Sequence, residues 1–209
     1  MKRCAVVCNG TISDYQWLSV ALSGYEAVFA ADGGLDHCRR AGVRPAAVLG
    51  DMDSLAGKED DAQALIRFPA EKDFSDMELA VDHALGNGFG AVDVFGALGG
   101  RIDHELCNVM VCAKHPGTLR LLDAGSVIIA LDAGKSFSGA GSPGDIVTLA
   151  ALDEGARCST EGLRYALRDE SLARGSRGLS NIIEGGPFSV SVSSGTVLVI
   201  QLKGDHRAA

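Results

Sequence analysis

The chain has 209 residues, which fits one large domain or two small ones. Its composition is 46% hydrophobic and 22% charged, which is typical of a globular protein and excludes a disordered one. The formal net charge of -8 argues against a nucleic-acid or anionic-membrane partner, because such partners need a basic surface. Phosphate ligands are not excluded, since carboxylates can hold a metal ion that in turn holds phosphates.

The cysteines and the N-terminal segment indicate the cellular compartment in which we expect the protein. The six cysteines include no C-x-x-C spacing, so we predict neither a zinc site nor a disulfide framework. Free cysteines in this number indicate a reducing compartment, and we expect a cytoplasmic protein. The apolar run Cys4–Cys8 is short and ends at Asn9-Gly10, which predicts a strand rather than a signal peptide. No apolar stretch is long enough to span a bilayer.

The first part of the chain alternates short apolar runs with segments of helical period. This alternation predicts a Rossmann-like, mostly parallel sheet with helices on both faces. The predicted strands are Cys4–Cys8, Ala27–Ala31, Ala46–Leu49, Leu65–Phe68 and Ala91–Phe95. The predicted helices lie near Tyr15–Leu22, Leu35–Ala41, Asp60–Ala64, Asp76–Leu85 and Asp103–Ala113. Ligands of such sheets bind outside the carboxyl ends of the strands.

From about Leu119 the pattern changes to short strands without strong helices. Predicted strands are Leu119–Asp123, Val127–Leu131, Asp145–Leu152, which follows a Gly/Ser/Pro-rich loop, and Thr196–Leu202. Apolar residues at Phe188, Val190 and Val192 alternate with serines before the turn Ser194-Gly195, which predicts a hairpin. We therefore predict an α/β domain at residues 1–120 and an all-β domain at residues 121–209.

The acidic turn Gly50-Asp51-Met52-Asp53-Ser54 directly follows a predicted strand. If the chain stays extended, Asp51 and Asp53 point to the same side and their carboxylates share one small volume. Like charges so close are costly unless a cation lies between them, and oxygen ligands suit Mg²⁺. The alternative is a solvated Asp-rich turn, since aspartate favours turns.

A second acidic segment precedes the helix predicted at Asp76–Leu85. Ser75 followed by Glu78 is a capping-box pattern, so Asp76 and Glu78 are explained by the helix N-terminus alone. Capping does not need Asp73. Asp73 and Asp76 are therefore candidates for further metal ligands.

A glycine-rich turn, Gly96–Gly100, joins a strand to the next helix. Its glycines allow close backbone approach, the helix N-terminus offers free N–H groups to an anion, and Arg101 suits phosphate. Asp103 is either an N-cap or a site residue, and His104 and Asn108 share one helix face that looks toward the turn. The turn lacks the Walker pattern. We expect the buried stripe of this helix to comprise Leu106, Val109, Met110 and Ala113.

Polar residues also follow the first two strands. Asp32, in Ala31-Asp32-Gly33-Gly34, contacts a metal or a ribose, or caps the next helix. Asn9 has the same alternatives at the end of the first strand.

Taken in chain order, these motifs resemble the thiamine pyrophosphokinase family. The motifs are Ala31-Asp32-Gly33-Gly34, Gly50–Ser54, Asp73–Glu78, Gly99–His104 with Asn108, and Leu179-Ser180-Asn181. The resemblance covers nearly the whole chain. It implies an α/β catalytic domain followed by a β-sandwich, usually in a homodimer. It also implies transfer of a pyrophosphoryl group from ATP to the hydroxyl of thiamine, with release of AMP.

The resemblance implies roles at the matching positions. Asp51, Asp53 and Asp76 would hold Mg²⁺ with Asp73 beside them, and Arg101 would bind the polyphosphate. Asp73 or Asp103 is the candidate general base. The ATP or catalytic pocket would be lined by Asn9, Asp32, Gly33, Gly34, Asp103, His104 and Asn108. Ser180 and Asn181 resemble the thiamine-side motif, which in dimers of this type meets the catalytic domain of the partner subunit.

The chain departs from the family pattern at several positions. Met52 stands where the family usually has Phe, and Ser75 and Met77 stand where it usually has Thr, but no carboxylate is lost. The sole tryptophan is Trp17, so the β domain lacks the Trp on which some members stack the thiamine ring. Tyr165 or Phe188 is the candidate substitute.

Two alternatives remain open. A pyrophosphokinase acting on a pterin alcohol would share the acidic and Gly-Gly-Arg motifs, but it would not predict a β domain with Ser180-Asn181. A non-catalytic nucleotide- or thiamine-binding regulator seldom needs so many carboxylates facing phosphates.

Overall fold

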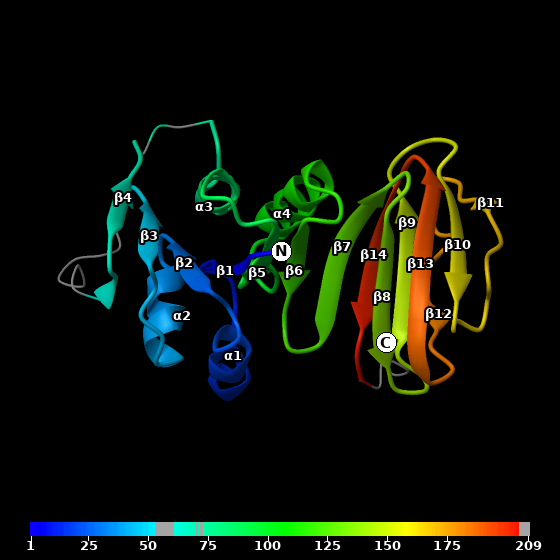
Figure 1. Ribbon diagram of the computed structural model, residues 1–209, viewed down its shortest axis with the longest axis horizontal. Helices are drawn as coiled ribbons and strands as arrows, with labels where there is room; N and C mark the ends of the chain where they lie inside the picture. The colour runs from blue at the N-terminus through cyan, green and yellow to red at the C-terminus, as the bar shows by residue number, and fades with distance from the viewer. Residues whose placement is uncertain (53–60, 70, 72, 205–209) are drawn as a thin grey trace. The chain divides into compact units, whose positions relative to one another are not determined.

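The computed structural model describes residues 1–52, 61–69, 71 and 73–204 (Figure 1). Contacts divide the chain into two compact units, which we describe separately. The first is Met1–Val111 with Leu121–Ala124, and the second is Cys112–Arg120 with Gly125–Ala209. None of the described helices combines the length and hydropathy that crossing a membrane requires.

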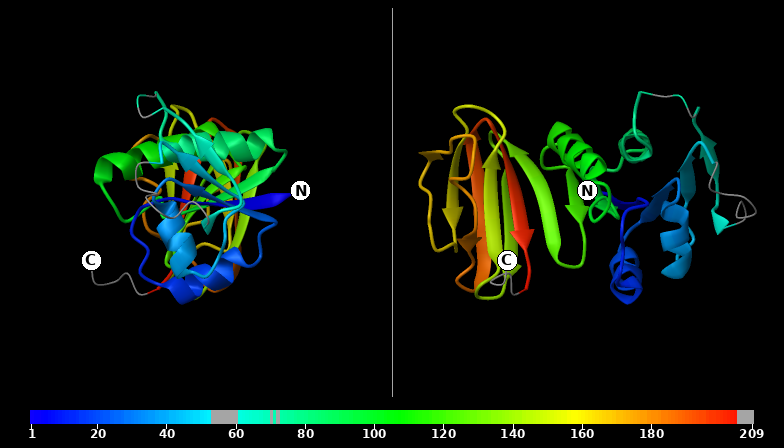
Figure 2. Two further views of the ribbon diagram at one scale, coloured as in Figure 1. Left: turned by 90° about the vertical axis from the view of Figure 1, so that its left-hand side faces the viewer. Right: turned by 180° about the vertical axis from the view of Figure 1, so that it is seen from behind.

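The first unit contains a parallel sheet in the strand order β5-β1-β2-β3-β4. The strands are β1 (Arg3–Val7), β2 (Ala27–Ala31), β3 (Ala47–Gly50), β4 (Leu65–Arg67) and β5 (Ala91–Phe95), and β6 (Leu119–Leu122) follows them in the chain. The helices are α1 (Tyr15–Leu22), α2 (Gly34–Arg40), α3 (Asp76–Gly86) and α4 (Ile102–Lys114). Helices α1 and α2 cover one face of the sheet and α3 the other (Figures 1 and 2). The predicted mixed α/β class is confirmed.

The central strand β1 is buried from Cys4 to Val7. Near-continuous apolar sequence is typical of a parallel strand covered on both faces. Helix α2 approaches this strand very closely, because a Cβ atom added at Gly34 would lie 1.9 Å from the carbonyl oxygen of Val7. Only glycine permits this approach, which places the start of α2 against the end of β1.

Helix α3 begins as its capping residues predict. The Ser75 hydroxyl accepts a hydrogen bond from the Glu78 backbone N–H at 3.2 Å. The buried residues of this helix are Met77, Ala80, Val81 and Ala84, which recur at helical spacing. Local chemistry therefore fixes both the start of this helix and the face that it buries.

The helix predicted at Asp60–Ala64 is wrong for Ala62–Ala64, and Asp60 lies outside the described residues. The backbone groups here bond across to neighbouring segments instead of along a helix. The N–H of Gln63 donates to the Pro45 carbonyl at 3.0 Å, and the Ala64 carbonyl accepts from the Val48 N–H at 3.0 Å.

The buried stripe predicted for α4 is wrong at Leu106 and Met110, while Val109 and Ala113 are half-buried. Leu106 and Met110 are 63% and 56% exposed, whereas Val111 and Cys112 are buried. Ile102, Leu106 and Met110 lie one turn apart and form an exposed apolar row along the helix, which we call the α4 row. The periodicity identified an amphipathic helix correctly, but not what its apolar face contacts.

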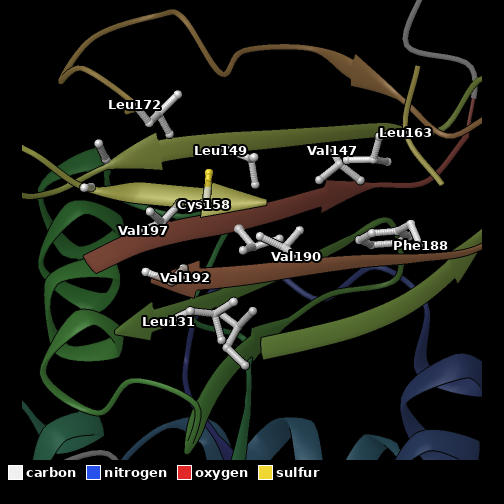
Figure 3. Packing of buried hydrophobic residues seen from close by; sticks show 14 of the residues in the cluster. Leu131, Val147, Leu149, Cys158, Leu163, Leu172, Phe188, Val190, Val192 and Val197 are labelled. Carbon is white, nitrogen blue, oxygen red and sulfur yellow. The ribbon is translucent and has the colours of Figure 1, made fainter. Parts of the chain in front are cut away.

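The second unit contains two antiparallel sheets, β12-β9-β14-β7 and β11-β10-β13-β8. Their strands are β7 (Ser126–Asp132), β8 (Ser136–Gly141), β9 (Ile146–Ala151), β10 (Arg157–Glu161), β11 (Glu170–Ser171), β12 (Asn181–Ile182), β13 (Gly186–Ser194) and β14 (Thr196–Leu202). Side chains from both sheets meet in one core, where Leu149 and Val190 lie among the buried residues (Figure 3). The predicted hairpin is wrong in its pairing, because β13 pairs with β8 and β10 while β14 pairs with β7 and β9.

The Gly/Ser/Pro-rich segment before Asp145 is predicted as a loop, but its residues Ser136–Gly141 form β8. The strand turns Phe137 toward the core and leaves space at Gly139 for the ring of Phe188, which a Cβ there would approach to 2.6 Å. Glycine at inward positions hides the strand from pattern analysis, because a strand is recognised by its large inward side chains.

We expect Gly34→Ala to destabilise the protein by about 1–3 kcal/mol, because the new methyl group overlaps the Val7 carbonyl. Gly86→Ala is the matched control, since nothing lies within 4 Å of its added Cβ. That change should be neutral or stabilising by up to about 1 kcal/mol. Urea unfolding of both variants measures the difference, and equal midpoints would contradict the close approach.

Candidate functional site

A pocket of about 400 Å³ lies in the first unit, at the carboxyl ends of its parallel strands. It is lined from the ends of β1, β2 and β5 and from the starts of α3 and α4. The lining residues are Cys8, Asn9, Gly10, Ala31, Asp32, Ser75, Asp76, Met77, Gly96, Ala97, Gly100, Arg101, His104, Glu105 and Asn108. The pocket therefore collects residues from four of the motifs that the sequence singled out.

The ends of β1 and β5 are interlocked at the pocket. The Gly10 N–H donates to the Gly96 carbonyl at 2.8 Å, and a Cβ added at Gly10 would lie 2.3 Å from that oxygen. Gly96 has a φ of 67°, a conformation that favours glycine, and its own Cβ would meet the Cys8 carbonyl at 2.4 Å. These glycines bring the first-strand turn and the glycine-rich turn to one wall of the pocket.

Asp32 ends β2 in a left-handed conformation, with a φ of 44°. This conformation is uncommon for residues other than glycine, although aspartate tolerates it. The Asp32 N–H donates to the Leu49 carbonyl at 2.7 Å, and its side chain packs against Gly50. The carboxylate of Asp32 therefore lies beside the residue that begins the acidic turn.

Gly33 and Gly34 do not line the pocket; they make room beside it. A Cβ added at Gly33 would lie 2.5 Å from the side-chain amide of Asn9. Asn9 itself lines the pocket, so Gly33 lets its side chain occupy this position.

The acidic turn does not stay extended. Met52 is buried and has a φ of 69°, which is not extended backbone. Asp53 and Ser54 lie outside the described residues, and the half-buried Asp51 does not line the pocket.

The fit to Mg²⁺ depends on the carboxylates near the pocket. Within the described ranges, no three acidic, histidine or cysteine side chains converge as a ready-made metal cage. Asp32 and Asp76 nevertheless line the same pocket, whereas Asp73 is exposed and does not line it. Mg²⁺ commonly takes one or two carboxylates, with phosphate oxygens and waters completing its shell, so the donor chemistry fits.

Anion-binding groups at the start of α4 are engaged by carboxylates of the same segment. The Arg101 guanidinium donates to both oxygens of Asp103, at 2.5 and 3.1 Å, and this bond lowers the pKa of Asp103 to about 2. The Gly100 N–H donates to Glu105 at 2.6 Å. Arg101 lines the pocket and Asp103 does not.

His104 and Asn108 both reach the pocket from the first turns of α4. The amide of Asn108 donates to the Ala97 carbonyl at 2.8 Å, which ties the glycine-rich turn to the helix. Asn108 therefore shapes this wall as well as lining it.

Cys8 and Glu105 also line the pocket, although no sequence motif predicts them there. Cys8 stands at the carboxyl end of β1, and that position was the available signal. Burial, with a smaller contribution from Asp76, raises the pKa of the Cys8 thiol, so it stays protonated. Glu105 could have been found as an acidic residue in the first helical turn after a glycine-rich loop.

In the second unit, Asn181 is buried and fully engaged with the main chain. Its side chain accepts from the N–H groups of Tyr165 and Ile182 and donates to the Tyr165 carbonyl at 2.8 Å. Ser180 is exposed and left-handed, with a φ of 59°. A small pocket of about 80 Å³ beside them is lined by Leu149, Tyr165, Leu167, Leu172, Arg177, Gly178, Leu179 and Asn181.

Both halves of the chain match models of one protein family. The family model "Thiamin pyrophosphokinase, catalytic domain" matches residues 19–122, and "Thiamin pyrophosphokinase, vitamin B1 binding domain" matches residues 137–197. A curated thiamine pyrophosphokinase of Bacillus subtilis (strain 168) is 38% identical over 91 residues, which are 40% of this chain and 42% of that protein. The matched segment thus spans less than half the length of that relative.

Solved structures show the same fold. A thiamine pyrophosphokinase from Bacillus subtilis has a TM-score of 0.84 at 21% identity, covering 98% of this chain and 100% of that one. Yeast thiamin pyrophosphokinase has a TM-score of 0.68 at 14% identity, covering 96% and 86%. The likeness extends over the α/β unit and the antiparallel unit together.

The Arg101–Asp103 pair leads to a prediction about protonation. We expect Arg101→Met to raise the pKa of Asp103 from about 2 toward its ordinary value of 3.8, because the main cause of the depression is removed. Carboxyl-detected NMR titration measures this value. Asp169, whose pKa is lowered by Arg157, is the internal control and should not move. An unchanged Asp103 in the variant would contradict the pairing.

Proposed function

Because the chain belongs to the thiamine pyrophosphokinase family, we propose that it transfers a pyrophosphoryl group from ATP to the hydroxyl of thiamine. The products are thiamine diphosphate and AMP. The observation that carries this proposal is the pocket in which Asp32, Asp76 and Arg101 meet at the strand ends. It combines carboxylates for a metal with a cation for phosphates.

The two substrates are assigned to different parts of the chain. We infer that residues 1–120 form a Rossmann-like catalytic domain, and that residues 121–209 form a β-sandwich that binds thiamine and supports dimerisation. The parallel strand order and the position of the pocket support the first assignment. The match of the vitamin B1 binding model supports the second. The buried thiols suit a cytoplasmic location.

In the proposed reaction, the thiamine hydroxyl oxygen forms a bond to the β-phosphorus of ATP. The bond between that phosphorus and the oxygen bridging to the α-phosphorus breaks, and AMP leaves with the bond electrons. Phosphoryl transfer asks the protein mainly for positioning and charge stabilisation. Arg101 supplies charge stabilisation once it exchanges Asp103 for the polyphosphate, while Asn9, His104 and Asn108 orient the nucleotide.

Asp51, Asp53 and Asp76 are the proposed Mg²⁺ ligands, with Asp73 as the further candidate; Asp32 lines the same pocket as Asp76. The bound ion supplies Lewis-acid neutralisation of the phosphate charge. The hydroxyl proton leaves to solvent or to Asp73. Asp103 is the alternative base, because the bond to Arg101 that lowers its pKa to about 2 is released when Arg101 binds the polyphosphate.

Tyr165 is the proposed stacking surface for the thiamine ring. It is 62% exposed and its backbone is held by Asn181, whereas Phe188 is buried in the core and unsuitable. The adjacent pocket of about 80 Å³ is smaller than the ~300 Å³ or more of typical ligand sites. A second surface is therefore needed to enclose thiamine, which supports a homodimer in which Ser180 and Asn181 face the partner subunit.

The α4 row of Ile102, Leu106 and Met110 is the proposed dimer contact in the first unit. These three exposed side chains lie on the helix that also carries His104 and Asn108. With about 3.6 residues per turn, this row lies on a different face of α4 from His104 and Asn108, so a second copy that covers the row would not cover those pocket residues.

The test of the reaction is incubation with ATP, Mg²⁺ and either thiamine or a hydroxymethyl pterin. We expect AMP and thiamine diphosphate to form in equal amounts with thiamine only. Product from the pterin alone would establish the alternative acceptor. ATP binding without AMP release from any acceptor would indicate a non-catalytic regulator.

Carboxylate variants test the metal assignment. We expect Asp51→Asn and Asp76→Asn each to reduce the rate of AMP formation by roughly 10²–10³-fold, because charge stabilisation near the phosphates is lost. Asp82→Asn is the control, since it makes the same change at an exposed position of α3. Circular dichroism should be unchanged in all three variants. Near-normal turnover of Asp51→Asn would remove that residue from the site.

The dimer has its own test. We expect Leu106→Glu to shift the protein from dimer to monomer in size-exclusion chromatography with light scattering, because a charge would be buried at the contact. Val20→Glu is the control, since Val20 is 70% exposed on α1 and outside the α4 row. A dimer that survives Leu106→Glu would place the contact elsewhere.

A further inference from the structure

We infer that Arg177, held in place by Glu170, selects the uncharged ring of the acceptor for the small pocket of the second unit and keeps the charged ring outside it. This inference rests on the proposed function, because it concerns which part of thiamine the pocket holds. Glu170 lies on β11, and Arg177 lies in the segment that precedes Leu179-Ser180-Asn181. Neither residue belongs to the motifs that predicted the site.

The pocket has an apolar floor and a polar rim. Leu149 and Leu172 belong to the buried core of this unit, and Leu167 packs against that core (Figure 3). On the rim, the side-chain amide of Asn181 is engaged with the main chain. Among the described residues that line this pocket, Arg177 is the one that carries a charge. It is therefore the polar group that decides which ligand enters.

The backbone beside Arg177 is fixed against β9. A Cβ added at Gly178 would lie 2.1 Å from the carbonyl oxygen of Leu149, and the Leu149 N–H donates to the Gly178 carbonyl at 2.9 Å. The Ser180 N–H donates to the Thr148 hydroxyl at 3.1 Å. These contacts fix the point from which the side chain of Arg177 extends.

The far end of the Arg177 side chain is fixed by Glu170. Nη2 of Arg177 donates to Oε2 of Glu170 at 2.7 Å. Glu170 is itself held in the sheet, where it pairs with Cys158 of β10. A guanidinium carries several N–H donors, so the bond to Glu170 leaves others for a ligand. The side chain is 56% exposed, which keeps these donors accessible.

This rim suits one of the two rings of thiamine. The aminopyrimidine is uncharged, its ring nitrogens accept hydrogen bonds, and its methyl group suits an apolar floor. The thiazolium carries a permanent positive charge, which the guanidinium repels. A volume of about 80 Å³ has room for a single ring. The pocket therefore takes the aminopyrimidine, and the thiazolium with its hydroxyethyl group stays outside.

Glu170 makes an arginine compatible with a cationic substrate. The ion pair has no net charge, so the thiazolium outside the pocket meets a rim that is neutral as a whole. The N–H donors of Arg177 remain in place for the pyrimidine. Without the charge of Glu170, a single positive charge would lie beside the substrate cation.

The experiment compares two compounds in the presence of saturating ATP and Mg²⁺. For thiamine it measures KM and kcat. The second compound is an N-methylated hydroxyethylthiazolium, which keeps the charged ring and the hydroxyl but lacks the pyrimidine, and its inhibition constant against thiamine is measured. We expect Arg177→Met to raise KM for thiamine roughly tenfold with kcat unchanged, because a hydrogen bond from a charged donor to the bound substrate is lost. The inhibition constant of the thiazolium should stay the same or fall.

Glu170→Gln tests the neutralising role. It removes the charge and keeps a hydrogen-bond acceptor of the same shape. We expect it to raise KM for thiamine roughly threefold, because the charge of Arg177 is left uncompensated at an exposed position. In the Arg177→Met background the same change should have no further effect. A Glu170→Gln effect that persists without Arg177 would contradict the pairing.

Arg164→Met is the matched control. Arg164 is another exposed arginine of this unit, 4.0 Å from Glu184, and it does not line the pocket. Its substitution should leave the constants of both compounds unchanged. Thermal unfolding followed by circular dichroism shows whether each variant is folded at the assay temperature.

The outcomes separate the two levels of the proposal. A native protein that forms no AMP with thiamine would overturn the proposed function. Native turnover with unchanged KM for thiamine in Arg177→Met would overturn the ring selection alone. Equal rises for thiamine and for the thiazolium in Arg177→Met would mean that the residue does not distinguish the rings, and would overturn it too. If Arg177→Met does not fold, Arg177→Lys replaces it, because lysine keeps the charge but loses the planar fork of donors and should raise KM for thiamine alone.

Discussion

The contact between the backbones at Gly10 and Gly96 determines where this protein has its pocket. Two neighbouring parallel strands end at the same edge of the sheet, and their turns meet there without side chains between them. Polar residues that follow each strand are thereby gathered around one hollow. Side chains at these two positions would push the turns apart. The positions of all pocket side chains therefore depend on this close approach of the two backbones.

The pocket combines an acidic side and a basic side in a chain of net charge -8. Asp32 and Asp76 come from the end of β2 and the start of α3, whereas Arg101 comes from the start of α4, where Glu105 also lines the pocket. A polyphosphate chelated to a metal presents both charges, which matches this division. The proposed anion site therefore needs no overall basic surface, because complementarity is local.

The fold was predictable where the determinants are local in sequence. Ser75 and its neighbours specify the start of α3, and the strand ends identify most of the pocket lining. Prediction failed where contacts with distant parts of the chain determine the structure. The α4 row is exposed, although its spacing suggested a buried face. Strand β8 was not recognised because Gly139 has no inward side chain, and the ring of Phe188 fills that space. The left-handed conformation of Met52 could not be predicted from the sequence either, because methionine has no preference for a positive φ.

The carboxylates that engage Gly100 and Arg101 have a consequence for which anions the pocket retains. Asp103 and Glu105 are tethered to the same helix as the donors they occupy, so they act at a high effective concentration. A small free anion offers few contacts in exchange and competes poorly with them. A chelated polyphosphate, the ligand of the proposed function, would offer contacts along the whole pocket wall and would displace both. Under the proposed function, the protein's own acids would therefore compete with any anion and set a minimum size for the ligand.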